Sequence, residues 1–327
     1  MSNINDIEAT QDHVPPTEFS QQDFIGKIFG GKYKVLKAIT KGGMGCVFKA
    51  EQVSLRRNVA LKVVLASEDV QANQRFLLEA SLTANLDHPN IVKVFDFGRT
   101  EDGILFLVME LLSGQDLKSW VANKGPLSVR ETVQMAKQLC GALSEAHSQN
   151  VIHRDIKPTN IMIGAYGEVL LVDWGIAKLR SWYEDNPKWV SARASEAFIA
   201  HRKSAVSGTP QYIAPEQLQG DVSHLSNKCD MYALGVMLYE ILAEERPFSG
   251  SMKDILQRKY TVKTSPKLSD MLRVKKHPRP VPDALVAVCE KAMAYEPSDR
   301  FVNMRQMAKG IQDWLDGVQQ EEEANSL

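Results

Sequence analysis

The first third of the chain alternates short apolar runs with polar turns, a pattern typical of β-strands. The run at 59–65 is almost continuously apolar, as expected of a buried strand. A longer stretch at about 71–86 has helical spacing and ends at the breaker sequence Asp-His-Pro-Asn. The pattern therefore predicts a small sheet-rich lobe with one main helix. The other predicted strands lie at 33–39, 47–50, 91–97 and 104–109.

The remainder of the chain has the apolar spacing of helices. Ser128 and Glu131 form a capping-box pattern at the start of one of them. Two later helices are predicted through 231–242 and 304–315, and the second should stop at Gly317. A larger helical lobe is therefore expected to follow the sheet-rich lobe.

No low-complexity linker or internal repeat divides the body of the chain. The first residues are polar and aperiodic, with two adjacent prolines, and the last residues are acidic. Both ends are therefore expected to lie outside the folded domain. The predicted parts are a flexible leader at 1–28, a domain at 29–316 with lobes at about 29–112 and 113–316, and an acidic tail at 317–327.

Composition narrows the classes of partner. The 39 basic and 40 acidic residues nearly cancel, which indicates neither a nucleic-acid partner nor a charged membrane surface. No apolar run approaches the roughly 20 residues needed to span a bilayer, and no signal-peptide core is visible. The 4 cysteines are isolated, which argues against a zinc site and fits a reducing cytosol. We expect a cytoplasmic protein.

A glycine-rich turn at 40–47 joins the first two predicted strands. Glycines let backbone N–H groups approach phosphate oxygens, although this pattern alone fits a plain hairpin turn about as well. Lys62 follows in an apolar strand, where a buried ammonium group needs an anion such as a phosphate or a carboxylate. Glu79, in the middle of the predicted helix, is the candidate carboxylate. The alternative is a lysine that reaches the surface beside a solvated glutamate.

The strongest candidate for chemistry is the polar sequence HRDIKPTN at 153–160, which lies between two apolar runs. A loop held between two strands is a rigid mount for functional groups. Together with Asp173, the residues Asp155 and Asn160 offer oxygen ligands for Mg²⁺ and a carboxylate that can accept a proton. A polar turn explains any one of these residues, but not the whole set in this order with Lys62 upstream.

Four motifs carry a family resemblance: VALK, HRDIKPTN, DWG and GTPQYIAPE, which begin at residues 59, 153, 173 and 208. Over about 31–315 the chain resembles the eukaryotic-type (Hanks-type) serine/threonine protein kinases common in bacteria. The resemblance implies an α+β, bilobal protein-kinase fold, in which a small N-terminal antiparallel sheet lobe with one main helix precedes a larger helical lobe. It also implies transfer of the ATP γ-phosphoryl group to serine or threonine hydroxyls of protein substrates, with Mg²⁺ as cofactor and Mn²⁺ as an alternative.

The resemblance assigns roles to the residues that match the family's motifs. Asp155 would orient the attacking hydroxyl as catalytic base, Lys157 would lie near the transferred phosphoryl group, and Thr209 would brace both. Asn160 and Asp173 match the metal ligands. The residues matched to nucleotide binding are Thr40 (where the family's first loop glycine is usual), Gly42, Gly43, Gly45, Val47, Ala60, Lys62 with its helix partner Glu79, the gatekeeper Met109, the hinge residues Glu110 and Leu112, and Met162.

Three further matches concern structure. Glu216 should pair with Arg300, and Asp230 should anchor the loop 153–160, which is the catalytic loop of the family. His147 lies on an apolar helical face and is interpreted as a core or interface histidine, not a ligand.

Besides Thr40, the sequence departs from the family pattern at two places. Trp174 replaces the usual phenylalanine, and we hypothesise that its indole N–H donates to the hydroxyl of Thr83; a tolerated aromatic replacement is the alternative. The segment 173–216 is longer than usual and rich in serine. A phosphate there could bind Arg154 and order the segment, which predicts autophosphorylation through transient self-association. The plain alternative is a surface insertion with incidental serines.

Three other functions compete with the kinase interpretation. A pseudokinase would bind nucleotide as a scaffold without turnover; Thr40 and Trp174 favour it, whereas the complete set of catalytic and metal residues argues against it. A small-molecule kinase of similar fold is disfavoured by the GTPQYIAPE segment, which shapes a peptide-binding surface in protein kinases. A dinucleotide-binding oxidoreductase is excluded because the glycine loop joins two strands and does not open a helix.

Overall fold

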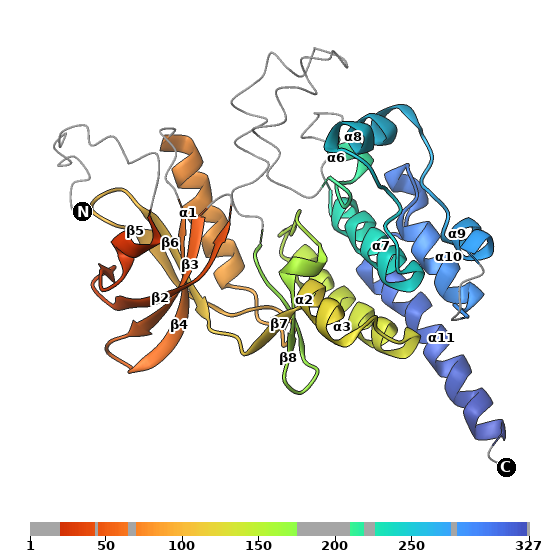
Figure 1. The fold of residues 1–327 in the computed structure, drawn as a ribbon, viewed down its shortest axis with the longest axis horizontal. Helices are drawn as coiled ribbons and strands as arrows, with labels where there is room; N and C mark the ends of the chain where they lie inside the picture. The colour runs from red at the N-terminus through yellow and green to blue at the C-terminus, as the bar shows by residue number, and fades with distance from the viewer. Residues whose placement is uncertain are drawn as a thin grey trace. The chain divides into compact units, whose positions relative to one another are not determined.

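The chain folds as two compact units (Figure 1). The first contains the chain up to Ser81 together with Val94–Leu111, and the second contains Leu82–Lys93 and the chain from Leu112 onward. The first unit is built on a sheet and the second is mainly helical, so the predicted α+β architecture is confirmed. The computed structural model describes residues 20–42, 45–64, 70–174, 210–218, 226–275 and 280–325.

Six strands form one antiparallel sheet in the first unit, in the order β1-β2-β3-β4-β6-β5. Strand β4 lies between β3 and β6 and is buried along most of its length, as its apolar sequence predicts. Its register places Lys62 opposite Val47 of β3 and Leu107 of β6. The elements are β1 (Ile28–Phe29), β2 (Tyr33–Gly42), β3 (Gly45–Gln52), β4 (Arg57–Val64), helix α1 (Val70–Ala84), β5 (Val94–Arg99) and β6 (Leu105–Glu110).

One face of this sheet carries a hydrophobic core with four phenylalanines at its centre. Phe24 contacts Phe29 and Phe48, and Phe29 contacts Phe106, with ring centroids 5.7–5.8 Å apart. The rings meet in tilted and edge-to-face arrangements, which suit the quadrupoles of aromatic side chains. The core therefore ties the short N-terminal elements to the sheet.

The stretch 20–28 is folded, so the flexible leader predicted at 1–28 is wrong over these residues. A 3₁₀ turn, η1 (Gln21–Phe24), begins at the N-cap Ser20 and ends at Phe24, which is 1% exposed. The sequence pattern missed this because a single buried aromatic residue in one short turn leaves no periodicity to detect.

Residues 82–93 belong to the second unit, although they fall inside the lobe predicted at about 29–112. Ile91 forms a parallel bridge with Leu171, and the N–H of Val92 donates to the carbonyl of Leu171 at 3.1 Å. The strand predicted to begin at residue 91 therefore starts only after these bonds, because they hold residues 91 and 92 in the second unit.

Helix α7 (Lys228–Ala243) forms the centre of the second unit, buried on nearly every side and packed against α3 (Val129–Ser148) and α10 (Asp283–Ala292) (Figure 1). The predicted capping box is confirmed, because Ser128 Oγ accepts from the Glu131 N–H and the Glu131 carboxylate accepts from the Ser128 N–H. The other elements are the three-stranded antiparallel sheet of β7 (Gly114–Asp116), β8 (Ile161–Gly164) and β9 (Val169–Leu171), and the helices α2 (Leu117–Lys124), η2 (Pro158–Asn160), α6 (Pro215–Leu218), α8 (Met252–Thr261), α9 (Leu268–Lys275) and η5 (Pro297–Asp299).

The last helix, α11 (Met304–Asn325), packs against α3 and α10 and continues past Gly317, where its end was predicted. A glycine inside a helix costs only about 1 kcal/mol relative to alanine, and the glutamates that follow are good helix formers. The separate acidic tail predicted at 317–327 is therefore wrong over 317–325. Of the helices in the described part of the chain, none is both long and apolar enough to cross a bilayer.

Candidate active site

The loop between α3 and β8 brings three of the predicted site residues together. Lys157 Nζ donates to Asp155 Oδ2 at 2.8 Å. The side-chain amide of Asn160 donates to the same carboxylate oxygen at 2.9 Å and to the backbone oxygen of Asp155 at 2.8 Å. Strand β8 follows this loop, but helix α3 precedes it. The prediction of a strand on both sides of the loop is therefore wrong for the N-terminal side.

Asp230, at the start of α7, anchors this loop as predicted. Its side chain is 0% exposed, and its two carboxylate oxygens accept the backbone N–H groups of His153 at 2.8 Å and Arg154 at 2.7 Å. His147 Nε2 lies 2.8 Å from Asp230 Oδ2, which confirms this histidine as a buried structural residue. Burial alone would raise the pKa of Asp230, but the hydrogen bond and charge of His147 and the bond from His153 outweigh it and lower this pKa.

His153 supports the loop from inside, a role that the sequence analysis did not assign. Its Nε2 lies 3.0 Å from the carbonyl of Val172, and its Nδ1 accepts the N–H of Asp155 at 3.3 Å. This bonding pattern suits the neutral imidazole that carries its proton on Nε2. Burial lowers the pKa of His153, although the nearby carboxylates of Asp230 and Asp155 oppose the shift. The signal in the sequence was a histidine in a polar loop, which alone does not distinguish support from catalysis.

The two predicted metal ligands are suited to a hard cation. The N–H of Val172 donates to the backbone oxygen of Asn160 at 2.9 Å, which brings the residue before Asp173 against the end of the catalytic loop. The Asn160 amide nitrogen makes both bonds to Asp155. The amide oxygen is therefore the atom of this side chain that is left to bind Mg²⁺. Asp173 has a φ of 59°, a left-handed conformation that is uncommon outside glycine and recurs at functional sites.

Trp174 does not make the bond that the sequence analysis hypothesised. The side chain is 4% exposed, and its ring lies 4.7 Å from the ring of His153. Within the described part of the chain, the indole N–H meets no hydrogen-bond acceptor, so it does not donate to Thr83. The aromatic contact with His153 places the indole where packing, and not a polar bond, determines its orientation.

In the first unit, four predicted nucleotide-binding residues share one face of the sheet. Val47 and Lys62 are register partners, as are Ala60 and Met109. Because side chains alternate between the two faces of a strand, all four lie on the face opposite the phenylalanine core. Thr40 pairs with Val47 and lies on the same side.

Position 45 shows why the turn between β2 and β3 needs glycine. A Cβ on Gly45, which has a φ of +152°, would lie 2.0 Å from the carbonyl oxygen of Val63. Gly42 is its register partner at the other side of the turn. The side chain of Glu79, and all of Gly43 and Thr209, lie outside the described residues, so the predicted roles of these three stay predictions.

The remaining predicted positions lie on separate elements. Glu110 ends β6, Leu112 follows it in the chain, and Met162 lies on β8, where it pairs with Leu170. The predicted pair of Glu216 and Arg300 is confirmed by two charge-assisted bonds of 2.6 and 2.8 Å between buried side chains.

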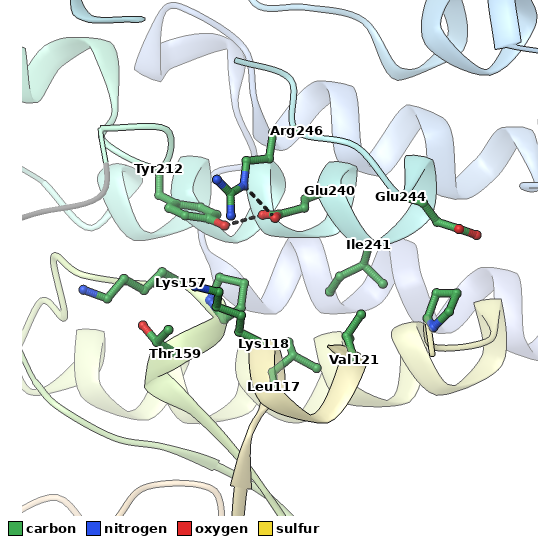
Figure 2. Close-up of a pocket in the computed structure, with 12 residues that line it drawn as sticks. Leu117, Lys118, Val121, Lys157, Thr159, Tyr212, Glu240, Ile241, Glu244 and Arg246 are labelled. Atoms are coloured by element: carbon green, nitrogen blue, oxygen red, sulfur yellow. Dashed lines mark hydrogen bonds and ion pairs between the residues drawn. The ribbon is translucent and has the colours of Figure 1, made fainter. Parts of the chain in front are cut away.

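A pocket of about 350 Å³ adjoins the catalytic loop in the second unit (Figure 2). Lys157 and Thr159 border it on one side and face Tyr212 and Glu240 across it. Leu117 and Val121 of α2 and Ile241 of α7 add apolar surface on opposite sides of the pocket (Figure 2). The sequence alone does not reveal this pocket, because the residues that line it come from segments far apart in the chain.

The carboxylate of Glu240 in this pocket is paired with two polar neighbours. Glu240 accepts a hydrogen bond from the hydroxyl of Tyr212 and another from Arg246 Nε at 2.9 Å (Figure 2). Burial and the adjacent Glu240 carboxylate raise the pKa of Tyr212, so its hydroxyl stays protonated and keeps donating. The pocket therefore offers an apolar surface beside a carboxylate whose charge is already paired.

Comparison with known proteins agrees with these features. Residues 33–311 match the model of the protein kinase domain, and the chain belongs to the protein kinase family. It is 40% identical over 232 residues to the serine/threonine-protein kinase pkn3 of Myxococcus xanthus, covering 69% of this chain and 40% of that protein. It is 34% identical over 294 residues to the serine/threonine-protein kinase PrkC of Bacillus subtilis, covering 89% of this chain and 42% of that one.

A third relative gives the same picture. The serine/threonine-protein kinase PknA of Mycobacterium tuberculosis is 40% identical over 233 residues, which cover 69% of this chain and 50% of PknA. The chain thus spans half or less of the length of these curated relatives. The family resemblance stated from the sequence motifs is confirmed.

Proposed function

We propose that this protein transfers the γ-phosphoryl group of ATP to serine or threonine hydroxyls of protein substrates. The observation that carries the proposal is the Asp155 carboxylate, held by Lys157 and Asn160 in a loop that Asp230 anchors. A carboxylate fixed in this way can orient a hydroxyl group and accept its proton. Phosphoryl transfer mainly requires such positioning together with stabilisation of charge.

In the proposed reaction the substrate hydroxyl oxygen forms a bond to the γ-phosphorus while the bond between that phosphorus and the ADP oxygen breaks. The hydroxyl proton passes to Asp155, and ADP leaves with the electron pair of the broken bond. Lys157 stabilises negative charge on the phosphoryl group as it transfers. Thr209 braces Asp155 and Lys157.

We propose that Asn160 and Asp173 hold the divalent cation, Mg²⁺ or alternatively Mn²⁺. Their donor set, an amide oxygen and a carboxylate, is of the hard type that such ions favour. When bound, the ion neutralises phosphate charge. The chain itself keeps the Asn160 oxygen free by using the amide nitrogen for both bonds to Asp155.

We propose that the residues matched to nucleotide binding each hold one part of ATP. Lys62, with Glu79 as its helix partner, holds the α- and β-phosphates, and the Gly42, Gly43 and Gly45 turn covers them. Thr40 belongs to the same phosphate-covering turn. The backbone of the hinge residues Glu110 and Leu112 bonds the adenine, and Val47, Ala60, Met109 and Met162 complete the nucleotide site. The shared face of Val47, Ala60, Lys62 and Met109 supports this assignment.

We further propose that the active protein is cytoplasmic and autophosphorylates within 173–216 through transient self-association. All four cysteines are buried and unpaired, as is usual in a reducing compartment. Only the replacements at Thr40 and Trp174 favour the pseudokinase alternative, whereas Asp155 is in place with Lys157 and Asn160 both bonded to its carboxylate.

The test is incubation of the purified full chain with ATP, Mg²⁺ and myelin basic protein, followed by mapping of the phosphorylated residues by mass spectrometry. The expected result is phosphoserine and phosphothreonine on the substrate and within 173–216. Asp155→Asn serves as the matched control. Transfer no faster with the natural chain than with Asp155→Asn would overturn the proposed function.

A further inference from the structure

Lys259 of α8 is buried, with 2% of its surface exposed, although lysine is rarely buried without an anion to pair with. Burial lowers the pKa of its ammonium group well below the usual value, and the charge of Glu216 opposes the shift. Glu216 already makes two bonds to Arg300. Lys259 therefore calls for an explanation other than neutralising a carboxylate.

The bonds of Lys259 go to the backbone on both sides of one residue. Its Nζ donates to the carbonyl of Gln211 at 2.5 Å and to that of Ile213 at 2.7 Å. It also lies 4.4 Å from the ring centroid of Phe248 and 5.2 Å from that of Tyr232, at distances typical of cation–π contacts. Lys259 thus ties α8 to the segment that carries Tyr212.

Tyr212 links this contact to the active site. Its ring lines the pocket across from Lys157 and Thr159, and its hydroxyl donates to Glu240 (Figure 2). Because the carbonyls before and after Tyr212 are both held, the backbone there cannot turn without breaking a bond to a buried ammonium group. Lys259 can therefore act on the pocket without being part of its lining.

We propose that Lys259 is a positioning residue for the protein substrate, which fixes Tyr212 through the backbone at 211–213 and so maintains the pocket beside the catalytic loop. The proposal rests on the proposed function, since the pocket is taken to contact the protein substrate. Removing the ammonium group alone would leave the carbonyls of Gln211 and Ile213 without this donor, and polar groups that lose their partner away from water destabilise a fold. The lysine therefore holds these two carbonyls, and with them the backbone on either side of Tyr212.

The test uses full-length variants. Lys259→Met keeps the length of the side chain and removes every donor, whereas Lys259→Gln keeps an N–H donor. Lys228→Met is the matched control, because Lys228 also donates to a backbone carbonyl of the second unit, but to that of Phe301. Steady-state kinetics with myelin basic protein give kcat and the KM values for protein and ATP.

A second readout does not depend on turnover. Fluorescein-labelled myelin basic protein is titrated with the chain that carries Asp155→Asn, with and without Lys259→Met, and fluorescence anisotropy reports the affinity. Thermal unfolding of every variant is recorded in parallel. This arrangement separates a change in substrate binding from a general loss of structure.

In Lys259→Met we expect the KM for myelin basic protein to rise about tenfold, as loss of charge-assisted hydrogen bonds predicts, while the KM for ATP stays within about twofold. The anisotropy titration should show the same weakening. Lys259→Gln should restore part of the affinity, and Lys228→Met should match the natural chain. The melting temperatures of Lys259→Met and Lys228→Met should both fall, because each variant leaves backbone carbonyls without a donor, so a loss of affinity confined to Lys259→Met is not a general loss of stability.

An unchanged KM for myelin basic protein in Lys259→Met would overturn the proposal. So would parallel increases in both KM values in Lys259→Met and Lys228→Met, because they indicate a general loss of structure. If Lys259→Met does not fold, Lys259→Gln decides, because it removes the charge and part of the donor capacity, and an unchanged KM for myelin basic protein in that variant contradicts the proposal. If the natural chain shows no transfer, the proposed function fails instead, and the anisotropy comparison still decides the role of Lys259.

Discussion

His147 Nε2 lies 2.8 Å from Asp230 Oδ2, across 83 positions of sequence, inside the second unit. The same carboxylate holds the backbone N–H groups of His153 and Arg154 at the start of the catalytic loop. One buried acidic side chain therefore connects helix α3, helix α7 and the loop that carries Asp155. Stability and catalysis should both respond to its replacement.

We predict that Asp230→Asn lowers the free energy of unfolding by about 3–5 kcal/mol, the usual loss when one partner of a buried charged network is removed. The asparagine side chain has one acceptor oxygen, so it cannot hold both backbone N–H groups and His147. Urea unfolding followed by circular dichroism measures the change. Asp270→Asn is the control, because its ion pair with Arg273 is exposed and should contribute under about 1 kcal/mol. Equal stability of the two variants would contradict the anchoring role.

Asp155→Asn and Lys62→Met should each lower turnover by at least roughly 10³-fold, since each removes a preorganised electrostatic contact. Steady-state rates with ATP and myelin basic protein test this. Lys309→Met is a matched control for the lysine, because its pair with Asp313 is exposed on α11. Near-normal turnover in either active-site variant would remove the proposed mechanism.

The stability of the protein should fall as the pH drops below about 6.5, and His153 should account for part of the fall. Burial lowers the pKa of this histidine in the folded state, so the unfolded chain binds more protons. Its contribution is then fully present above the unfolded pKa and is lost as the pH decreases toward the folded one. Unfolding free energies of the natural chain and His153→Gln, measured from pH 8 to pH 5, should converge as the pH falls. A constant difference across that range would count against a neutral, buried His153.

Arg246→Ala should change the preference of the pocket beside the catalytic loop. With Arg246 removed, the Glu240 carboxylate loses its ion-pair partner and keeps only the bond from Tyr212. A basic side chain of the substrate could then pair with it, which we expect to raise the rate for peptides with arginine near the acceptor serine by about fivefold to tenfold. A positional peptide library measures the preference, and Arg273→Ala is the control. An unchanged preference would show that this pocket does not select substrate side chains.

Local patterns in the sequence predicted most of the fold and the catalytic loop. The capping box at Ser128, the apolar run of β4 and the motif around Asp155 are each contained in a few neighbouring residues. The errors lie where structure depends on distant partners. The strand predicted from residue 91 starts late because Ile91 and Val92 bond to Leu171.

The same limit applies to individual side chains. The hypothesised bond between Trp174 and Thr83 required the indole N–H to point at the Thr83 hydroxyl. The indole instead packs against the His153 ring, and its N–H does not donate to Thr83. Nothing near Lys259 in the sequence indicates that its partners are carbonyls at 211 and 213, because the contact spans 46–48 positions. Residues that belong to a sequence motif can be recognised from the sequence. Residues whose role depends on distant neighbours become visible only in the folded structure.

The burial of all four thiols has a practical consequence for spectroscopy. Burial raises the pKa of Cys140 to about 12 and places that of Cys229 well above its usual value, so the reactive thiolate is scarce at neutral pH. The natural chain should therefore react only slowly with maleimide reagents. One cysteine introduced at the exposed turn between β8 and β9, as in Tyr166→Cys, would take a single fluorophore or spin label without any natural cysteine having to be removed.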